Sequence, residues 1–264
     1  MNNSPITARE KFALNAYLNR TQKEYMEFMG LDSFPAVERK PVVLTMEEAN
    51  AKGYGVWAQV LYNVETDKYS LLAWKDLYIP ELHADYILFH EYTHVADIEK
   101  LAKKDKSKYT KIRGYMEYHA SQVELMKQLG ATHFSDKISF SMNDVVYGVA
   151  NDRPVIDVLR NGKKTATDLI QRVDFPTNVE MLATTISLIF NHLGRISICK
   201  LYATDYFLYQ NELEEFGVEE VFFGKDAWLL IRAIMQGIMS ESAIEMEAGI
   251  HVGILCRLFE RYGL

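Results

Sequence analysis

The chain has 264 residues, of which 48% are hydrophobic and 25% charged, a composition typical of a soluble globular protein with one large domain or two small ones. Its net charge of -7 at pH 7 argues against general binding to DNA, RNA or anionic membranes. The two cysteines, Cys199 and Cys256, have apolar neighbours and no metal-ligand spacing. We therefore expect two buried thiols in a reducing compartment.

The N-terminal segment predicts the location of the protein. Residues 1–5 are polar and run directly into a helical pattern, so no signal peptide is expected. No uninterrupted apolar run reaches the ~18 residues that a membrane span needs. These features predict a cytoplasmic protein without a membrane partner.

The first predicted elements are a helix and a β-hairpin. Apolar side chains recur at helical spacing over residues 7–29, which predicts an amphipathic helix. Its apolar positions include four aromatic residues, Phe12, Tyr17, Tyr25 and Phe28. Residues 56–62 and 69–74 are rich in strand-forming residues and flank a polar turn, which predicts a hairpin. Between the helix and the hairpin we expect a proline-containing connection at 31–40, a strand at 42–45, a short helix at 46–52 and a turn at 53–55.

The most informative motif lies at residues 90–94, which read His-Glu-Tyr-Thr-His inside a predicted helix spanning 81–101. Positions i and i+4 lie on one face of a helix, so His90 and His94 can reach the same metal ion. Glu91, about 100° round the helix from His90, points toward the open position of the metal. The motif therefore predicts a zinc site with Glu91 as the general base.

A second predicted helix, running from about residue 107 or 110 to 130, supplies a third ligand. Zinc sites of hydrolases usually take three protein ligands, and a carboxylate from a second helix is a common third. Glu117 follows His94 by 23 residues (117 − 94), enough for one helix to end and the next to return antiparallel. Ala120, one turn further on, would let the two helices approach closely. Glu124 is the rival ligand, and the choice stays open.

Four further residues near the motif could assist a zinc site. Asp97 could accept the second ring proton of a ligand histidine, although a solvated surface aspartate fits the same pattern. A donor that stabilises the oxyanion is also expected. Tyr115, Tyr118 and His119 are close in sequence, and nothing in the sequence chooses among them.

The segment His90–Asp97 resembles the active-site helix of gluzincin metallopeptidases such as the thermolysin group. Residues 117–124 resemble the ExxA segment of the ImmA/IrrE family of small zinc endopeptidases. The resemblance covers about residues 55–130 and implies a zincin-like core. It also implies the roles of four residues: His90, His94 and Glu117 as zinc ligands and Glu91 as general base. Proteins of this family often cleave a repressor, which would be a suitable target here.

The C-terminal half is expected to be mainly helical. Candidate helices lie at 143–150, 154–160, 165–173, 177–193, 195–210, 225–240 and 241–262, with breaks at 174–177 and 214–217 and a strand-like stretch at 137–140. We divide the chain into a zincin-like catalytic region, 1–130, and a helical region, 131–264, that can pack into the same domain.

Taken as a whole, the sequence predicts an α+β, zincin-like metalloprotease. The expected function is zinc-dependent hydrolysis of a protein or peptide substrate by an intracellular metallo-endopeptidase, with no nucleic-acid partner. An aminopeptidase is less favoured because no Gly-x-Met-x-Asn segment precedes the motif. Two alternatives remain: a catalytically silent zincin-fold regulatory or interaction protein, and a coincidental surface pattern of two histidines and a glutamate.

Overall fold

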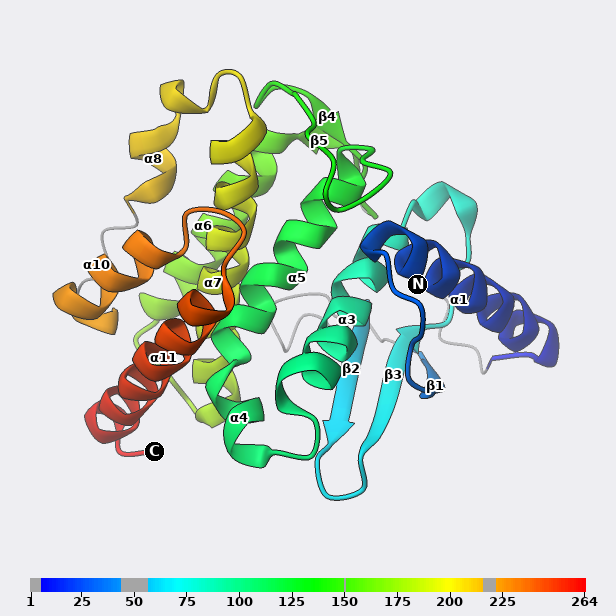
Figure 1. Cartoon of the computed structure of the whole chain (residues 1–264), viewed down its shortest axis with the longest axis horizontal. Coiled ribbons are helices and arrows are strands. Elements are labelled where there is room, and N and C mark those ends of the chain that lie inside the picture. Colours follow the sequence, from blue (N-terminus) through cyan, green and yellow to red (C-terminus); the bar gives the residue numbers. More distant parts are fainter. Residues whose placement is uncertain (1–5, 44–56, 150, 216–221) are drawn as a thin grey trace.

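The computed structural model describes residues 6–43, 57–149, 151–215 and 222–264. Within these ranges the fold is α+β, as the sequence predicts, and helices dominate over a small sheet (Figure 1). The short helix expected at 46–52 and the turn expected at 53–55 lie outside the described residues, as do residues 44–45 of the strand expected at 42–45.

The sheet contains the predicted hairpin. Its strands are β1 (Val37–Val42), β2 (Ala58–Asn63) and β3 (Lys68–Trp74), in the order β1-β3-β2. Strands β2 and β3 are antiparallel, with Ala58 opposite Ala73. Next to this pair the rings of Trp57 and Trp74 pack with their centroids 4.7 Å apart. The hairpin is therefore confirmed, and β2 lies at one edge of the sheet.

Strand β1 corrects two expectations. It begins at Val37, inside the segment 31–40 that we expected to be a connection, and it ends at Val42, where we expected a strand to begin. It pairs in parallel with β3 alone among the described strands. Because an edge strand needs hydrogen-bond donors on one side only, it tolerates Pro41. The proline therefore concealed a strand that only its pairing with β3 reveals.

Helix α1 (Ala8–Met29) is confirmed. It begins with a capping box, in which the Glu10 N–H donates to Thr7 Oγ1 at 3.2 Å and the Thr7 N–H donates to Glu10 Oε2 at 2.7 Å. Its buried side consists of Leu14, Leu18, Thr21, Tyr25 and Phe28. Phe12 is instead 76% exposed, because it lies roughly 200° round the helix from Leu14.

The helix that carries the motif is shorter than predicted. Helix α3 spans Asp85–Asp97 rather than 81–101. Pro80–Leu82 form a separate 3-10 turn, which ends where His83 adopts a left-handed backbone conformation with φ 45°. At the other end, Ile98–Ala102 form a π-helical turn. The motif therefore lies in the regular part of the helix.

The second predicted helix is two helices with a break at Ile112. Helix α4 (Lys106–Lys111) begins with Asp105, whose carboxylate accepts from the Lys108 N–H at 2.9 Å. Helix α5 (Arg113–Gln128) follows directly. The chain leaves α5 through Gly130 at φ 80°, which agrees with the predicted stop.

The C-terminal half is mainly helical, as predicted, but several boundaries differ. The described helices are α6 (Val155–Ile170), α7 (Val179–Tyr202), α8 (Gln210–Glu214), α10 (Lys225–Ile234) and α11 (Glu241–Tyr262). The single helix α6 replaces the two helices expected at 154–160 and 165–173. The single helix α7, which ends at Tyr202, replaces the two expected at 177–193 and 195–210. A helix at 143–150 is wrong, since Val145–Val146 form the short strand β4, which pairs with β5 (Arg153–Pro154). At 137–140 only Phe140 makes an isolated bridge, to Ala203.

Helix α7 continues through Gly194 because this glycine permits close packing. A Cβ atom there would lie 2.1 Å from the backbone oxygen of Tyr118 on α5. The two helices therefore approach more closely than any side chain at position 194 would allow. The gap expected between helices at 177–193 and 195–210 is therefore absent, and Gly194 lets α7 pack closely on α5.

Helix α5 lies at the centre of the molecule (Figure 1). It packs against α3 on one side and against α7 on the other, and these are the two most extensive helix–helix contacts in the described structure. The sheet and α1 lie on the α3 side, while α6 packs against α7. This order of packing places residues from both halves of the chain around the motif.

Helix α7 is long and apolar enough to cross a membrane, although we expected no such segment. Of its most apolar window, 67% is buried inside the fold, as in the core helix of a globular protein. Cys199 on α7 is buried as expected. Cys256 is exposed on the outward side of α11, so the expectation of a second buried thiol is wrong.

Candidate metal centre

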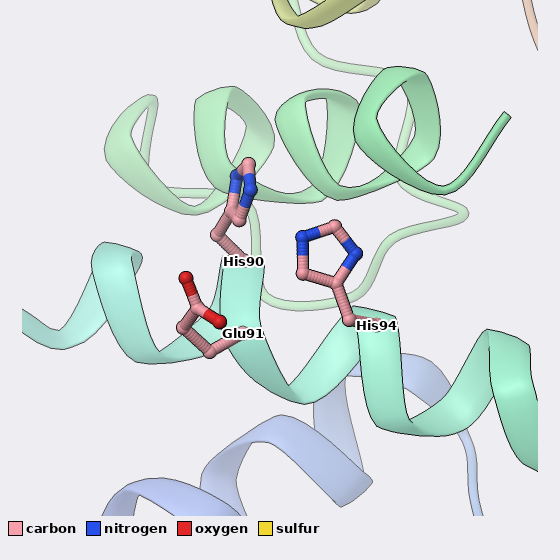
Figure 2. Close-up of side chains that lie close together, drawn as sticks. All are labelled: His90, Glu91 and His94. Atoms are coloured by element: carbon pink, nitrogen blue, oxygen red, sulfur yellow. The ribbon is translucent and has the colours of Figure 1, made fainter. Parts of the chain in front are cut away.

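His90 and His94 rise from the same side of α3 toward α5 (Figure 2). Their ring centroids are 4.8 Å apart, and the ring planes are nearly perpendicular at 85°. The two side chains are 13% and 12% exposed. The potential ligand atoms of His90, Glu91 and His94 all lie within 4.8 Å of one another. One turn of helix therefore brings two imidazoles and a carboxylate together.

Glu117 approaches both imidazoles from α5. Its Oε2 lies 3.6 Å from His90 Nε2 and 3.8 Å from His94 Nε2, and its Oε1 accepts from Ser187 Oγ at 3.1 Å. Ligands of a tetrahedral zinc ion with bonds of about 2.0–2.1 Å are roughly 3.4 Å apart. Each of these two nitrogen–oxygen distances therefore exceeds the spacing of two zinc ligands by only a few tenths of an ångström.

Glu124 contacts the other ring nitrogen of His90. Its Oε2 lies 3.0 Å from His90 Nδ1, and Arg195 Nη2 donates to both of its oxygens at 3.0 Å. Burial opposes the charge of this carboxylate, but Arg195 and His90 together lower the pKa of Glu124 to about 2. An ionised carboxylate at Nδ1 orients a ligand histidine and directs its Nε2 toward the metal.

The charges of the site favour a cation between α3 and α5. Burial opposes a charge on His90, but Glu117 and Glu124 raise the pKa of His90 to about 10. For His94 burial is the main cause, and its pKa is lowered to about 3. The pKa of Glu117 lies well below its usual value because the two histidines outweigh burial. Buried carboxylates therefore stabilise positive charge at the point where the imidazoles meet.

Glu91 lies on the neighbouring face of α3, beside strand β2. Its Oε2 accepts a hydrogen bond from the Val60 N–H at 2.6 Å. Burial raises the pKa of Glu91 to about 7, although His90 opposes this increase. A carboxyl group with a pKa near neutrality can both take up and release a proton at physiological pH.

A cleft of about 620 Å³ opens over these residues. One wall is the edge strand β2 together with Trp57, and the floor is formed by α3 and α5. The opposite wall is α7, which contributes Glu180, Ser187, Asn191 and Arg195. The cleft therefore lies between the sheet and the helical C-terminal half.

Sequence reasoning missed the residues of α7. Ser187 and Arg195 contact Glu117 and Glu124, which lie 70 and 71 residues earlier in the chain. No motif links positions so far apart. The one usable signal was Arg195 itself, a charged residue near the middle of a mainly apolar helix whose other charged residues, Glu180 and Lys200, lie in its end turns. A charge in the middle of such a helix needs a buried partner.

Asp97 does not contact a histidine of the motif, which corrects one expectation. Its two oxygens lie 2.9 and 3.0 Å from His119 Nδ1 on α5. His94 Nδ1 is buried without a hydrogen-bond partner among the described residues. Asp97 and His119 therefore join α3 to α5, and Asp97 does not orient a histidine of the motif.

None of the three expected oxyanion donors lines the cleft among the described residues. The Tyr118 hydroxyl donates to the Gly237 carbonyl at 2.7 Å, and the ring of Tyr115 stacks on His119 with centroids 5.5 Å apart. The sequence left the oxyanion donor open among Tyr115, Tyr118 and His119, and none of these three side chains reaches the cleft, because proximity in sequence does not fix the direction of a side chain on a helix.

Replacing Asp97 with alanine is expected to lower the free energy of unfolding by about 1–3 kcal/mol, because His119 would lose a buried partner. Urea unfolding of wild type and variant measures the difference. The exposed Asp32 offers a control, since Asp32→Ala should change stability by less than ~0.5 kcal/mol. Equal effects of the two substitutions would show that the Asp97–His119 contact does not stabilise the fold.

The site combines imidazoles, carboxylates and a guanidinium from α3, α5 and α7 beside the free edge of a sheet. Neither a family model, nor a curated protein, nor a solved structure matches this chain. Its function is therefore inferred from the spacing of the motif, the cleft and the charges within it.

Proposed function

We propose that this protein is a zinc-dependent peptide hydrolase, an intracellular metallo-endopeptidase with a zincin-like arrangement of sheet, motif helix and ligand helix. His90, His94 and Glu117 hold the zinc ion, and Glu91 is the general base. The observation that carries the proposal is the approach of Glu117 Oε2 to both imidazole Nε2 atoms, at 3.6 and 3.8 Å. The distance from Glu117 Oε2 to each nitrogen is thus close to the spacing of two zinc ligands.

The contacts of the two glutamates support different roles for them. Glu117 faces both Nε2 atoms, whereas Glu124 faces His90 Nδ1 and is paired with Arg195. A carboxylate that is already bonded to a guanidinium and to the outer ring nitrogen is suited to orient a ligand. We therefore assign Glu117 as the third ligand and Glu124 as a positioning residue.

The position of Glu91 supports its role as a base. When bound, zinc polarises a carbonyl group and makes water more acidic. Glu91 accepts the proton that water loses and passes it to the leaving amine. The Val60 N–H holds the Glu91 carboxylate at the edge of β2, where an extended peptide can add to the sheet. The base and the peptide are thereby brought to the same edge.

Zinc content tests the assignment of ligands. Protein purified without chelator is expected to contain about one zinc ion per chain. Glu117→Gln should lose more zinc affinity than Glu124→Gln. The affinity of Glu124→Gln should fall about 10–100-fold, because Glu124 only orients a ligand. The exposed Glu245 offers a matched control, and Glu245→Gln should bind zinc normally. If Glu124→Gln loses zinc and Glu117→Gln keeps it, the two roles are reversed.

Peptide cleavage tests the activity. A peptide library incubated with zinc-loaded protein should be cut internally, chelation should stop the cleavage, and added zinc should restore it. Peptides with acetylated amino termini should be cut equally well, whereas an aminopeptidase would require a free terminus. A zinc-loaded protein that leaves the library intact would support the alternative, a silent regulatory or interaction protein with the same fold.

A further inference from the structure

A second, smaller pocket adjoins the cleft at the N-terminal end of α5. It has a volume of about 210 Å³ and apolar walls, formed by Ile186 and Phe190 of α7 and by Leu255 and Phe259 of α11. The pocket and the cleft share four lining residues: Tyr109, Arg113, Ala183 and Ser187. The two spaces are therefore neighbours with a common rim.

The shared rim begins beside the candidate metal centre. Ser187, which lines both spaces, donates a hydrogen bond to Glu117 Oε1 at 3.1 Å. Arg113 precedes Glu117 by one helical turn on α5, and its Nη1 lies 3.3 Å from the Tyr109 hydroxyl at the exposed rim. A peptide held over Glu117 therefore passes the opening of the pocket.

The lining of the pocket is mainly apolar, and its charged side chain, Arg113, belongs to the rim shared with the cleft. Gly114 leaves room for α11 to approach, since a Cβ atom there would lie 2.3 Å from Glu247 Oε1 and 3.0 Å from His251 Nδ1. His251 lines the pocket, and its Nδ1 lies 4.0 Å from Glu247 Oε1 and is buried without a hydrogen-bond partner among the described residues. Burial lowers the pKa of His251 to about 4 and raises that of Glu247 to about 8. Both groups are therefore mostly neutral near pH 7.

We propose that this pocket binds one large apolar side chain, aromatic or long aliphatic, of the peptide substrate close to the cleaved bond. The inference rests on the proposed peptidase function and adds a specificity to it. A volume of about 210 Å³ is below the ~300–1,000 Å³ of pockets that hold whole small ligands. The pocket therefore suits a single side chain that enters from a peptide in the cleft.

Binding of two small probes tests the pocket without relying on activity. N-acetyl-phenylalaninamide should bind to the wild-type protein about 10–100-fold more tightly than N-acetyl-alaninamide, because its ring leaves water. The exposed Ala183 lies at the rim, so Ala183→Phe should fill the opening and remove the difference in affinity between the two probes. Thr110→Phe, at another exposed rim position, should act in the same way. Ala8→Phe, on the exposed start of α1, should retain the difference. NMR titration measures all four proteins.

Cleavage of a randomised peptide library distinguishes this proposal from the proposed function. Wild type should select large apolar residues at one fixed position next to the cleaved bond. Thr110→Phe, at a position that lines the pocket but not the cleft, should lose that selection while it still cuts. Cleavage without such selection overturns the pocket proposal and leaves the peptidase in place. If Ala183→Phe abolishes probe binding but the wild-type protein cuts no peptide, the peptidase function is refuted and the pocket is not. Equal binding of both probes refutes the pocket.

Discussion

Replacing Glu91 with glutamine is expected to reduce peptide cleavage by about 10²–10⁴-fold, the usual contribution of a general base. Glutamine has nearly the same shape as glutamate and can accept the Val60 N–H bond through its amide oxygen. It cannot take a proton from water at neutral pH. Initial rates on an internally quenched peptide, measured at equal zinc content, give the ratio.

The zinc content of the Glu91→Gln variant should stay near that of wild type, because Glu91 is not one of the proposed ligands. A matched control is Glu81→Gln, since Glu81 is exposed in the 3-10 turn before α3 and its substitution should leave the rate unchanged. Retained proteolysis in Glu91→Gln would remove Glu91 from the role of base. Loss of zinc from this variant would instead make Glu91 a ligand.

The Gly194→Ala substitution is expected to destabilise the protein by an amount at or above the upper end of the ~1–3 kcal/mol range for overpacked sites. The added Cβ would lie 2.1 Å from the Tyr118 oxygen and 3.0 Å from its carbonyl carbon. These are backbone atoms within helix α5, so they cannot move aside as a flexible side chain can. Relief requires α7 to shift away from α5. Urea unfolding measures the loss of stability.

The same shift should weaken zinc binding, because α5 carries Glu117 and α7 carries Arg195, which holds Glu124. A glycine in open space provides the control. Gly253 lies in α11, where an added Cβ atom would meet no heavy atom of a neighbouring element within 4 Å, so Gly253→Ala should stabilise the helix by about 0.4–1 kcal/mol. If the two substitutions have the same effect, close packing at Gly194 does not hold the helices together.

Several features of this protein follow from local sequence alone. The i, i+4 spacing of His90 and His94 puts both rings on one face of any helix that contains them. The capping box at Thr7 marks the beginning of α1, and the alternating segments around residues 65–68 predict the hairpin. In each case the deciding contacts join residues close together in the chain, so a sequence pattern is sufficient.

Other features depend on how distant elements pack. Glu117 and Glu124 have similar positions on one helix, and only the contacts of α5 with α3 and α7 direct one toward the Nε2 atoms and the other toward Nδ1 and Arg195. Asp97 pairs with His119 for the same reason. These choices are made by side chains that meet across helices, and no spacing along the chain encodes them.

The sequence by itself determined the chemistry that is offered at the site, two imidazoles and an acid on one turn of helix. The tertiary structure decided which surfaces surround that chemistry: the edge of β2 on one side and α7 on the other. Gly194 illustrates the difference, because along the chain it falls in the gap between the helices expected at 177–193 and 195–210. In the fold it is the point where α7 comes close to α5. The sequence does not show this, because it does not reveal which backbone atoms lie opposite a position that has no side chain.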